Sequence, residues 1–448
     1  MMFRVGLAGL LAAALTQAAL AAPKPVHETW IGSWGYAPAP LPPGVTPAGP
    51  GPLTGPGPGP VPLGPIPAPS APAAPPAPPP PLLDNPGGVP VDVSGADLNN
   101  VTVRQLVRVS VGGKRLRLRI SNEGGADALT LGAVHVGEAG PDGSIVPGSD
   151  HVVTFDGRSG VTAPASSPVL SDPVDLATRP LEKLYISVHV PGAIPGRPTR
   201  SLFQYVAGAP GDLTAEARLP QARLMRVRPF VSLVEVQSAD APNVVVTLGD
   251  SITEGATSTG NAFRSWPDRL AERLADRSWA VVNVGISGNR LLRYGTGPTA
   301  LARLDRDVLS VPGVKAIILL EGINDIGRGF SPAGSTEPVT LEALEAADRQ
   351  IIARAHEKGV RVIGATLTPY VGASYASPDG EAVREGLNQW IRTGGEFDGV
   401  IDFAPAVADP AAPQTMATQF FIRDHLHPND AGYKAMGDAI DLKVITGR

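Results

Sequence analysis

The sequence predicts a three-layer α/β domain, in which a parallel sheet is flanked by helices, preceded by an all-β, jelly-roll-like domain. Between residues 89 and 236, short runs alternate apolar and polar residues, and clusters of Gly, Pro, Asp and Ser separate them. From Pro242 onward, apolar runs typical of buried strands alternate with segments of helical spacing. With 448 residues, 43% of them hydrophobic, the chain is long enough to form both domains.

Residues 1–22 have the pattern of a secretory signal peptide. Arg4 precedes the apolar run 5–15, and the small residues Ala19 and Ala21 form a peptidase site. The apolar run is shorter than the roughly 20 residues that a membrane-spanning helix needs. We therefore expect a secreted or periplasmic protein with no stable membrane span after the signal is cleaved.

Two segments follow before the β domain proper. Residues 23–36 include Trp30 and Trp34 and are expected to form the first strand of that domain. Residues 37–88 are dominated by Pro, Gly and Ala, and such a composition cannot bury enough side chain to offset the entropy of ordering. We expect a flexible linker or loop insertion here.

The β-sandwich domain is assigned to residues 89–236. Residues 101–110 and 114–121 alternate apolar and polar positions on either side of Gly112-Gly113, which predicts a β-hairpin with one buried face. Residues 184–190 repeat the alternation. Arginines are expected on the outward, solvated face, at Arg104, Arg108, Arg115, Arg117 and Arg119.

A second domain is assigned to residues 242–448. Strands are expected at 244–248, 280–284, 315–320, 360–367 and 400–403, and helices at 266–274, 341–358 and 381–393. Such an alternation gives a parallel sheet with helices on both faces, and ligands bind beyond the carboxyl ends of its strands.

Polar or glycine residues follow four of these predicted strands. They are Gly249-Asp250-Ser251 after the first, Gly288-Asn289 after the second, Asn324-Asp325 after the third, and Asp424 with His427 after the fifth. Because the carboxyl ends of parallel strands meet at one edge of a sheet, these residues are expected to lie together.

A serine, a histidine and an aspartate in this group suit nucleophilic catalysis. A serine hydroxyl such as that of Ser251 is a weak nucleophile until a base removes its proton, and His427 is the candidate base. Asp424, three residues earlier, can bind the other ring nitrogen and stabilise the imidazolium. His425 could compete for the role of base, but the D-x-x-H spacing favours His427.

These segments closely resemble the GDSL, or SGNH, hydrolase family. Gly249-Asp250-Ser251-Ile252 matches its nucleophile block, with Ile where the family often has Leu, and the other blocks follow in order over about 180 residues. Gly288, Asn324 in G-x-N-D, and Asp424 with His427 in D-x-x-H match these later blocks. The resemblance implies a serine esterase whose oxyanion hole uses the backbone N–H groups of Ser251 and Gly288 and the side-chain amide of Asn324.

Polar and planar side chains beside these blocks indicate the kind of substrate. Asn289 and Arg290 follow the oxyanion glycine, and Arg264 and Trp266 follow the nucleophile turn, which suits a hydroxylated alcohol such as a sugar. The β-rich region before the blocks also resembles the N-terminal part of some secreted family members. We therefore expect the protein to hydrolyse short-chain esters, in particular acetyl esters of carbohydrate. The substrate would be a small molecule or a polysaccharide.

Two alternatives stay open. One is a lipase or arylesterase acting on lipid or aryl esters. The other is a glycan-binding protein whose hydrolase-like domain is vestigial and whose β-sandwich carries recognition.

Several classes of function are disfavoured. The chain has no cysteine, which excludes disulfides and thiolate sites, and its net charge of -5 argues against a nucleic-acid partner. His425 and His427 have no further ligand cluster or H-E-x-x-H, so no metal is expected. Nucleotide-binding glycine motifs and a G-x-S-x-G elbow are missing from the sequence, and no cofactor is expected.

Overall fold

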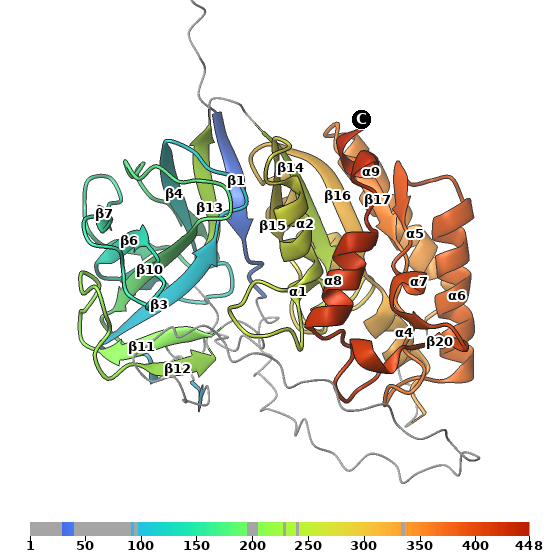
Figure 1. Ribbon diagram of the computed structural model, residues 1–448. Helices are drawn as coiled ribbons and strands as arrows, with labels where there is room; N and C mark the ends of the chain where they lie inside the picture. The colour runs from blue at the N-terminus through green and yellow to red at the C-terminus, as the bar shows by residue number, and fades with distance from the viewer. Residues whose placement is uncertain are drawn as a thin grey trace, which may run out of the picture.

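The computed structural model describes residues 29–39, 91–93, 97–194, 205–226, 230–238, 242–332, 337 and 339–447. Figure 1 shows a β-rich part beside an α/β part. The predicted fold class is confirmed, because antiparallel strands dominate the first part and a parallel sheet flanked by helices forms the second. The predicted signal peptide lies outside the described residues, as does the Pro-rich segment beyond residue 39. The first residues of that segment, Ala37 and Ala39, are buried, so the ordered chain extends further than expected.

The β-rich part consists mainly of two facing sheets whose apolar side chains share one core, including Leu118 and Val236 from one sheet and Val107 and Ile186 from the other. The first sheet contains, in spatial order, β1 (Thr29–Gly35), β13 (Val231–Ser238), β4 (Arg115–Ser121) and β9 (Pro168–Leu170). The second contains β2 (Val91–Asp92), β12 (Arg223–Arg226), β11 (Val206–Pro210), β3 (Val101–Arg108), β10 (Lys183–Val190), β6 (Val134–Glu138) and β7 (His151–Val153). A separate pair is formed by β5 (Leu129–Leu131) and β8 (Val161–Ala163).

The predicted hairpin over residues 101–121 is wrong, although both of its strands exist. β3 pairs with β10 and β11, whereas β4 pairs with β13 and β9, so the chain crosses from one sheet to the other at Gly112-Gly113. β3 is buried along almost its whole length rather than on one face only.

The prediction that the arginines lie on a solvated face is also wrong at Arg104. Its guanidinium is buried, donates from Nε to Ser187 Oγ at 2.8 Å, and donates to the backbone carbonyl of Ala217 at 3.0 Å. Arg108 points to the α/β part, where it lies 3.3 Å from Asp268 and 3.0 Å from Glu272. The other three arginines, Arg115, Arg117 and Arg119, are half-buried and bond Gln237, Glu235 and Glu123.

The α/β part is built on a parallel sheet of order β15-β14-β16-β17-β18. Its strands are β14 (Asn243–Gly249), β15 (Trp279–Asn283), β16 (Val314–Leu320), β17 (Arg361–Ala365) and β18 (Gly399–Ile401). The longer helices are α2 (Trp266–Leu274), α5 (Leu341–His356), α6 (Pro378–Thr393) and α8 (Asp430–Ala439). Shorter elements are α1 (Ser251–Glu254), α3 (Ala300–Arg303), the π-helical turn η2 (Leu304–Leu309), α4 (Ile323–Gly329), α7 (Ala404–Val407), β19 (Ala408–Asp409), β20 (Ala412–Met416), the 3₁₀ turn η3 (Thr418–Phe420) and α9 (Leu442–Thr446).

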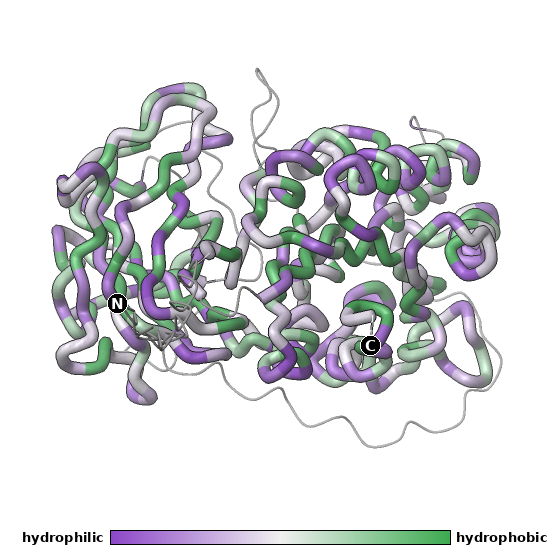
Figure 2. Tube along the Cα trace, turned by 90° about the horizontal axis from the view of Figure 1, so that it is seen from above, coloured by the Kyte–Doolittle hydropathy of each residue, from purple (hydrophilic) through white to green (hydrophobic). Residues whose placement is uncertain are grey.

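Local sequence accounts for these elements. Ser265 caps α2 in a reciprocal capping box with Asp268, and Pro267 occupies the first turn. β14 is apolar and almost fully buried because both faces of the parallel sheet are covered by helices. Figure 2 shows hydrophobic segments gathered inside the α/β part, with hydrophilic residues on the outer sides of the helices.

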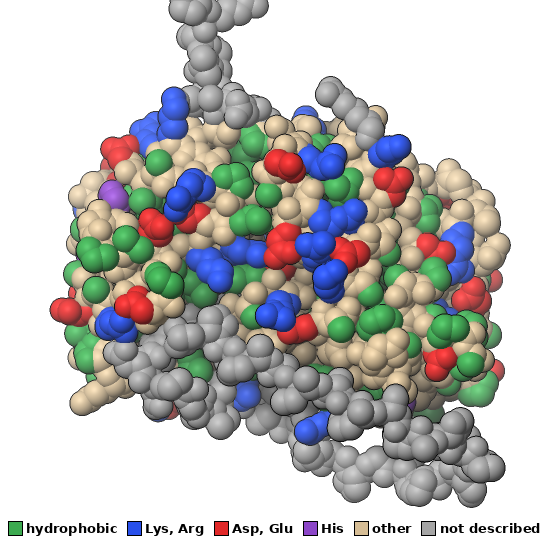
Figure 3. All heavy atoms as spheres, in the orientation of Figure 1, with side chains coloured by type: hydrophobic (Ala, Val, Ile, Leu, Met, Phe, Trp, Pro, Cys, Tyr) green, Lys and Arg blue, Asp and Glu red, His purple; other side chains and the backbone are tan. Residues whose placement is uncertain are grey.

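The two parts share a continuous interface. In it, β1 packs beside β15, the Gly32 N–H donates to the Pro312 carbonyl at 2.9 Å, and the Val281 N–H donates to Ser110 Oγ at 3.0 Å. Figure 3 shows side chains of both charges interspersed over the face that carries α2 and α8. None of the helices in the described ranges has both the length and the apolar character of a bilayer-spanning helix.

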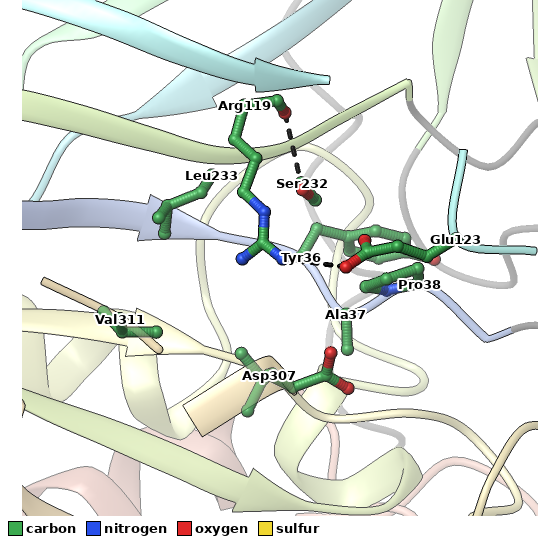
Figure 4. A pocket seen from close by; sticks show the side chains of 10 residues that line it. Tyr36, Ala37, Pro38, Arg119, Glu123, Ser232, Leu233, Asp307 and Val311 are labelled. Atoms are coloured by element: carbon green, nitrogen blue, oxygen red, sulfur yellow. Dashed lines mark hydrogen bonds and ion pairs between the residues drawn. The ribbon is translucent and has the colours of Figure 1, made fainter. Parts of the chain in front are cut away.

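A small, partly open pocket also lies at this interface (Figure 4). Its walls come from the chain after β1, from β4 and β13, and from the α/β part, and Arg119 points at Glu123 beside it. Of its charged lining groups, Arg119 pairs with Glu123, and Asp307 pairs with Arg306 outside the lining. The lining does not include Ser251, Asp424 or His427.

Candidate active site

Ser251 is the first residue of α1, directly beyond the carboxyl end of β14, which lies between β15 and β16 in the sheet. Asp250 caps this short helix, because its Oδ1 accepts the Ile252 N–H at 2.9 Å. Gly255 ends the helix with a left-handed backbone, φ 103°. The tight turn holds the hydroxyl of Ser251 at the sheet edge with only 6% of the residue exposed.

Ser251, His427 and Asp424 form an unbroken chain of hydrogen bonds. Ser251 Oγ lies 2.8 Å from His427 Nε2, and His427 Nδ1 lies 2.6 Å from Asp424 Oδ2. Asp424 Oδ1 also accepts the backbone N–H groups of Leu426 at 3.1 Å and His427 at 3.0 Å. This arrangement orients the imidazole so that Nε2 can accept the serine proton.

The charge state of Asp424 suits this role. Burial by itself would raise its pKa, but the hydrogen bonds and the nearby charge of His427 lower the pKa to about 2. Asp424 is therefore an anion at neutral pH and can stabilise an imidazolium.

The neighbouring histidine does not join this chain. His425 has a left-handed backbone with φ 54°, and its ring lies 4.2 Å from the ring of Phe421, centroid to centroid. The structure thus brings His427, and not His425, to Ser251.

The three expected oxyanion donors lie at the same edge of the sheet, because they follow three neighbouring strands. Ser251 follows β14, Gly288 follows β15 and Asn324 follows β16. Gly288 has φ +76°, and a Cβ there would lie 2.8 Å from Thr296 Oγ1, so a larger residue would distort the loop. Asn324, in α4, donates one Nδ2 hydrogen to the Asn289 carbonyl at 3.1 Å. Among the described residues, the N–H groups of Ser251 and Gly288 have no hydrogen-bond acceptor. These donors are therefore free to bind an oxyanion.

A buried arginine lies behind these loops. Arg303 donates to the Gly249 carbonyl at 3.0 Å and to the Val284 carbonyl at 2.6 Å, at the ends of β14 and β15. Its Nε donates to Asn289 Oδ1 at 2.8 Å. One fully buried cation thus connects the loops that carry Ser251 and Gly288. No sequence motif marked this residue.

Buried carboxyl groups surround the same loops. Burial raises the pKa of Asp250 to about 7, that of Asp325 to about 6, and that of Glu321 well above its usual range. Asp325 accepts the Leu291 N–H at 2.8 Å and so holds the chain just after the oxyanion loop. Glu321 Oε2 has no hydrogen-bond partner among the described residues.

Glu254 is a second residue that sequence reasoning missed. Its Oε2 accepts the Ser287 N–H at 2.6 Å, which fixes the residue before Gly288. Its Oε1 accepts the hydroxyl of Tyr36 at 3.3 Å, from the chain just after β1. The N-terminal strand therefore reaches the oxyanion loop.

The four residues expected to contact substrate lie mostly in the interior. Asn289 and Trp266 are fully buried; Asn289 Nδ2 donates to the Pro298 carbonyl at 2.7 Å, and Trp266 packs against Phe403 with 5.1 Å between ring centroids. Arg290 is buried and paired with Glu337. The side chains of these three residues are thus engaged with other parts of the protein. The fourth, Arg264, is exposed and lies 3.3 Å from Asp430.

Within the described ranges, no group of three or more His, Asp or Glu side chains is arranged to hold a metal ion. The chemistry that the arrangement supports is nucleophilic attack by Ser251 with general-base assistance from His427.

Residues 247–435 match the model of the GDSL-like lipase/acylhydrolase family, a range that includes Ser251, Gly288, Asn324, Asp424 and His427. This match confirms the resemblance that the sequence motifs indicate. The comparison with curated protein sequences gave no significant match.

Solved structures resemble part of this chain. A member of the lipolytic protein G-D-S-L family from Veillonella parvula is 20% identical, with 45% of this chain and 98% of that chain covered and a TM-score of 0.35. A GDSL-like lipase from Bacteroides thetaiotaomicron is 18% identical, covering 46% and 89%, with a TM-score of 0.36. A variant of an acetyl xylan esterase from Geobacillus stearothermophilus is 23% identical, covering 45% and 94%, with a TM-score of 0.36.

Proposed function

We propose that this GDSL-like domain makes the protein an exported serine esterase that hydrolyses short-chain esters, acetyl esters of carbohydrate above all, through an acyl-Ser251 intermediate. The observation that carries the proposal is the chain Ser251–His427–Asp424, with 2.8 Å and 2.6 Å between successive partners.

The proposed reaction has two halves. His427 Nε2 takes the hydroxyl proton as Ser251 Oγ attacks the ester carbonyl carbon, and the donors of Ser251, Gly288 and Asn324 bind the oxyanion. The tetrahedral intermediate collapses, the bond to the alcohol oxygen breaks, and the imidazolium protonates that oxygen. Water then attacks the acyl-Ser251 with His427 again as base, which releases the acid and restores the serine.

The surface supports a short acyl group over a long lipid chain. The large hydrophobic side chains exposed in the described part of the chain are Val152, Leu170, Tyr294 and Ile422. Two of them lie in the β-rich part, and Tyr294 and Ile422 are single side chains on separate loops. The described residues around Ser251 therefore form no broad apolar surface of the kind that lipid substrates favour. The predicted signal peptide and the β-sandwich ahead of the domain support a polysaccharide outside the cytoplasm as the alcohol.

A panel of esters tests the proposal. The purified chain is assayed on acetylated sugars and polysaccharide, on aryl acetates, and on long-chain aryl esters and phospholipids, with Ser251→Ala as control. We expect release of acetate from the acetylated carbohydrates and no turnover by Ser251→Ala. Turnover of long-chain lipid alone would contradict the carbohydrate assignment. Equal activity of Ser251→Ala would contradict the catalytic assignment, and glycan binding without hydrolysis would favour the binding-protein alternative.

A further inference from the structure

The loop between α1 and α2, residues 255–264, has an unusual backbone. Three of its residues other than glycine have left-handed backbones: Thr257 with φ 65°, Asn261 with φ 56° and Phe263 with φ 56°. Threonine is disfavoured there because its Cβ is branched. A loop with several such residues keeps its conformation only where surrounding contacts impose it.

One side of this loop holds the segment that carries the catalytic histidine. Thr257 Oγ1 donates to the Pro428 carbonyl at 2.7 Å and lies 3.4 Å from the His427 carbonyl. Thr259 donates from its backbone N–H and from its hydroxyl to the two carboxylate oxygens of Asp430, each at 2.7 Å. The loop therefore fixes the backbone just after His427 at successive points.

The other side of the loop is held by the β-rich part. Asn261 Oδ1 accepts the Tyr205 N–H at 3.2 Å, and its Nδ2 donates to the Tyr205 carbonyl at 2.9 Å, just before β11. A Cβ at Gly260 would lie 2.3 Å from the Tyr205 ring, so that ring packs directly on the loop backbone. Phe263 lies under Arg108 of β3, 5.1 Å from ring centroid to guanidinium carbon. Figure 1 shows the loop reaching from α1 toward the β-rich part.

We propose that the β-rich domain takes part in catalysis by holding the 255–264 loop, and that this loop positions His427. Thr257 and Thr259 are positioning residues on the histidine side, and Asn261 is the positioning residue on the β-rich side. The inference rests on the proposed function, in which His427 is the base for Ser251. It assigns the β-rich domain a role distinct from glycan recognition.

The first test removes the hydroxyl that bonds the histidine segment. In the full chain, Thr257→Val should lower kcat on an aryl acetate by roughly 10- to 100-fold with KM little changed, because a small displacement of a catalytic group has that effect. Thr257→Ser keeps the hydroxyl and should retain most of kcat. The matched control is Thr393→Val, because the Thr393 hydroxyl also donates to a backbone carbonyl, that of Gln389 at 2.8 Å, on the exposed end of α6.

Thr257→Gly tests the positioning of His427 separately from the folding of the loop. Thr257→Gly relieves the left-handed strain, so the variant should be at least as resistant to heat as the wild type. It still lacks the hydroxyl, and its kcat should fall as in Thr257→Val. Wild-type kcat in a folded Thr257→Gly would overturn the positioning role.

The second test starts from the β-rich side. Asn261→Ala removes both bonds to Tyr205 and should also lower kcat. Because both residues act through one loop, the loss in Thr257→Val/Asn261→Ala should be smaller than the product of the two single losses. A loss equal to that product would mean that the residues act independently and would overturn the proposed coupling.

Labelling of Ser251 by a fluorophosphonate distinguishes a failure of the proposed function from a failure of the positioning inference. Ser251→Ala is the blank. If the wild type neither labels nor hydrolyses any ester of the panel, the proposed function fails and the positioning inference fails with it. If the wild type is active and Thr257→Val and Asn261→Ala keep its kcat and labelling rate, only the positioning inference fails.

Discussion

Asn324 donates its side-chain N–H to the backbone carbonyl of Asn289, 3.1 Å away, and this bond joins the loop after β16 to the loop that carries Gly288. The bond uses one of the two amide hydrogens and orients the other. The amide is therefore aligned before a substrate arrives, which is what makes an oxyanion donor effective.

Removal of the Asn324 amide should affect the transition state more than substrate binding. We expect Asn324→Ala to lower kcat by about 10²–10³ with a modest change in KM. Steady-state kinetics on an aryl acetate measures both constants, and Asn99→Ala, at an exposed asparagine of the β-rich part, is the control. A rise in KM with kcat unchanged would count against the oxyanion role.

The acid of the triad should be replaceable without loss of folding but with a severe loss of rate. Asp424→Asn keeps the size of the side chain but favours the wrong tautomer of His427, so kcat should fall by about 10³–10⁴. Asp127→Asn, at an exposed aspartate, should leave kcat unchanged. Full activity of Asp424→Asn at neutral pH would show that this carboxylate does not orient the base.

Arg303 should be important for both stability and rate. A lysine there has one nitrogen and cannot reach Gly249, Val284 and Asn289 together, so Arg303→Lys leaves buried acceptors without donors. Each such acceptor costs about 1–3 kcal/mol of unfolding free energy. Thermal denaturation should show a lower midpoint, and kcat should fall because the two loops are no longer connected.

The matched control for this prediction is Arg349→Lys, because Arg349 forms exposed ion pairs with Glu345 and Glu396. Exposed pairs of this kind contribute little to stability. Equal midpoints for the Arg303 and Arg349 variants would refute the connecting role of the buried cation.

The buried carboxyl groups predict how stability depends on pH. The pKa values of Asp250, about 7, and Asp325, about 6, lie above the usual value of 3.8, and that of Glu321 is also raised. Between about pH 4 and pH 7 the folded state thus binds more protons than the unfolded state, and stability falls as pH rises. Asp424, whose pKa is lowered to about 2, opposes this trend only in acid, where its contribution is lost as pH falls from about 4 through 2.

Thermal denaturation at a series of pH values checks this sign. The midpoint should be higher at pH 5 than at pH 8. Glu321→Gln has no charge to gain, so its midpoint should change less over that range. A midpoint that rises from pH 5 to pH 8 in the wild type would contradict the predicted proton uptake.

The elements of the α/β part could be predicted because their signals are local. The expected helix over residues 266–274 coincides with α2, where Ser265 and Pro267 mark the start. The apolar run of β14 needs no knowledge of its neighbours to be recognised as a buried strand. Once a parallel sheet is assumed, the carboxyl ends of its strands must meet, which predicts that Ser251, Gly288 and Asn324 lie at one edge of the sheet.

The features that could not be predicted are the directions of side chains and the contacts between residues that are far apart in the sequence. The alternation in residues 101–121 identifies two strands, but it does not say that β10 and β13 are their partners. Position beside the oxyanion glycine says nothing about the direction of Asn289, whose side chain turns inward to Arg303. The 255–264 loop has no motif, because its conformation is imposed by Tyr205 and Asp430 from far along the chain.

The place of β1 restricts the order in which the chain can fold. Its ladder partner is β13, about 200 residues further along, and Gly32 also bonds Pro312. An emerging chain must therefore keep β1 unpaired until both later segments have been synthesised, and closing so long a loop is slow. Without β1, β13 would lose its ladder partner and β15 would lose the strand that packs beside it. The two halves of the molecule should consequently melt in one cooperative transition rather than as two independent bodies.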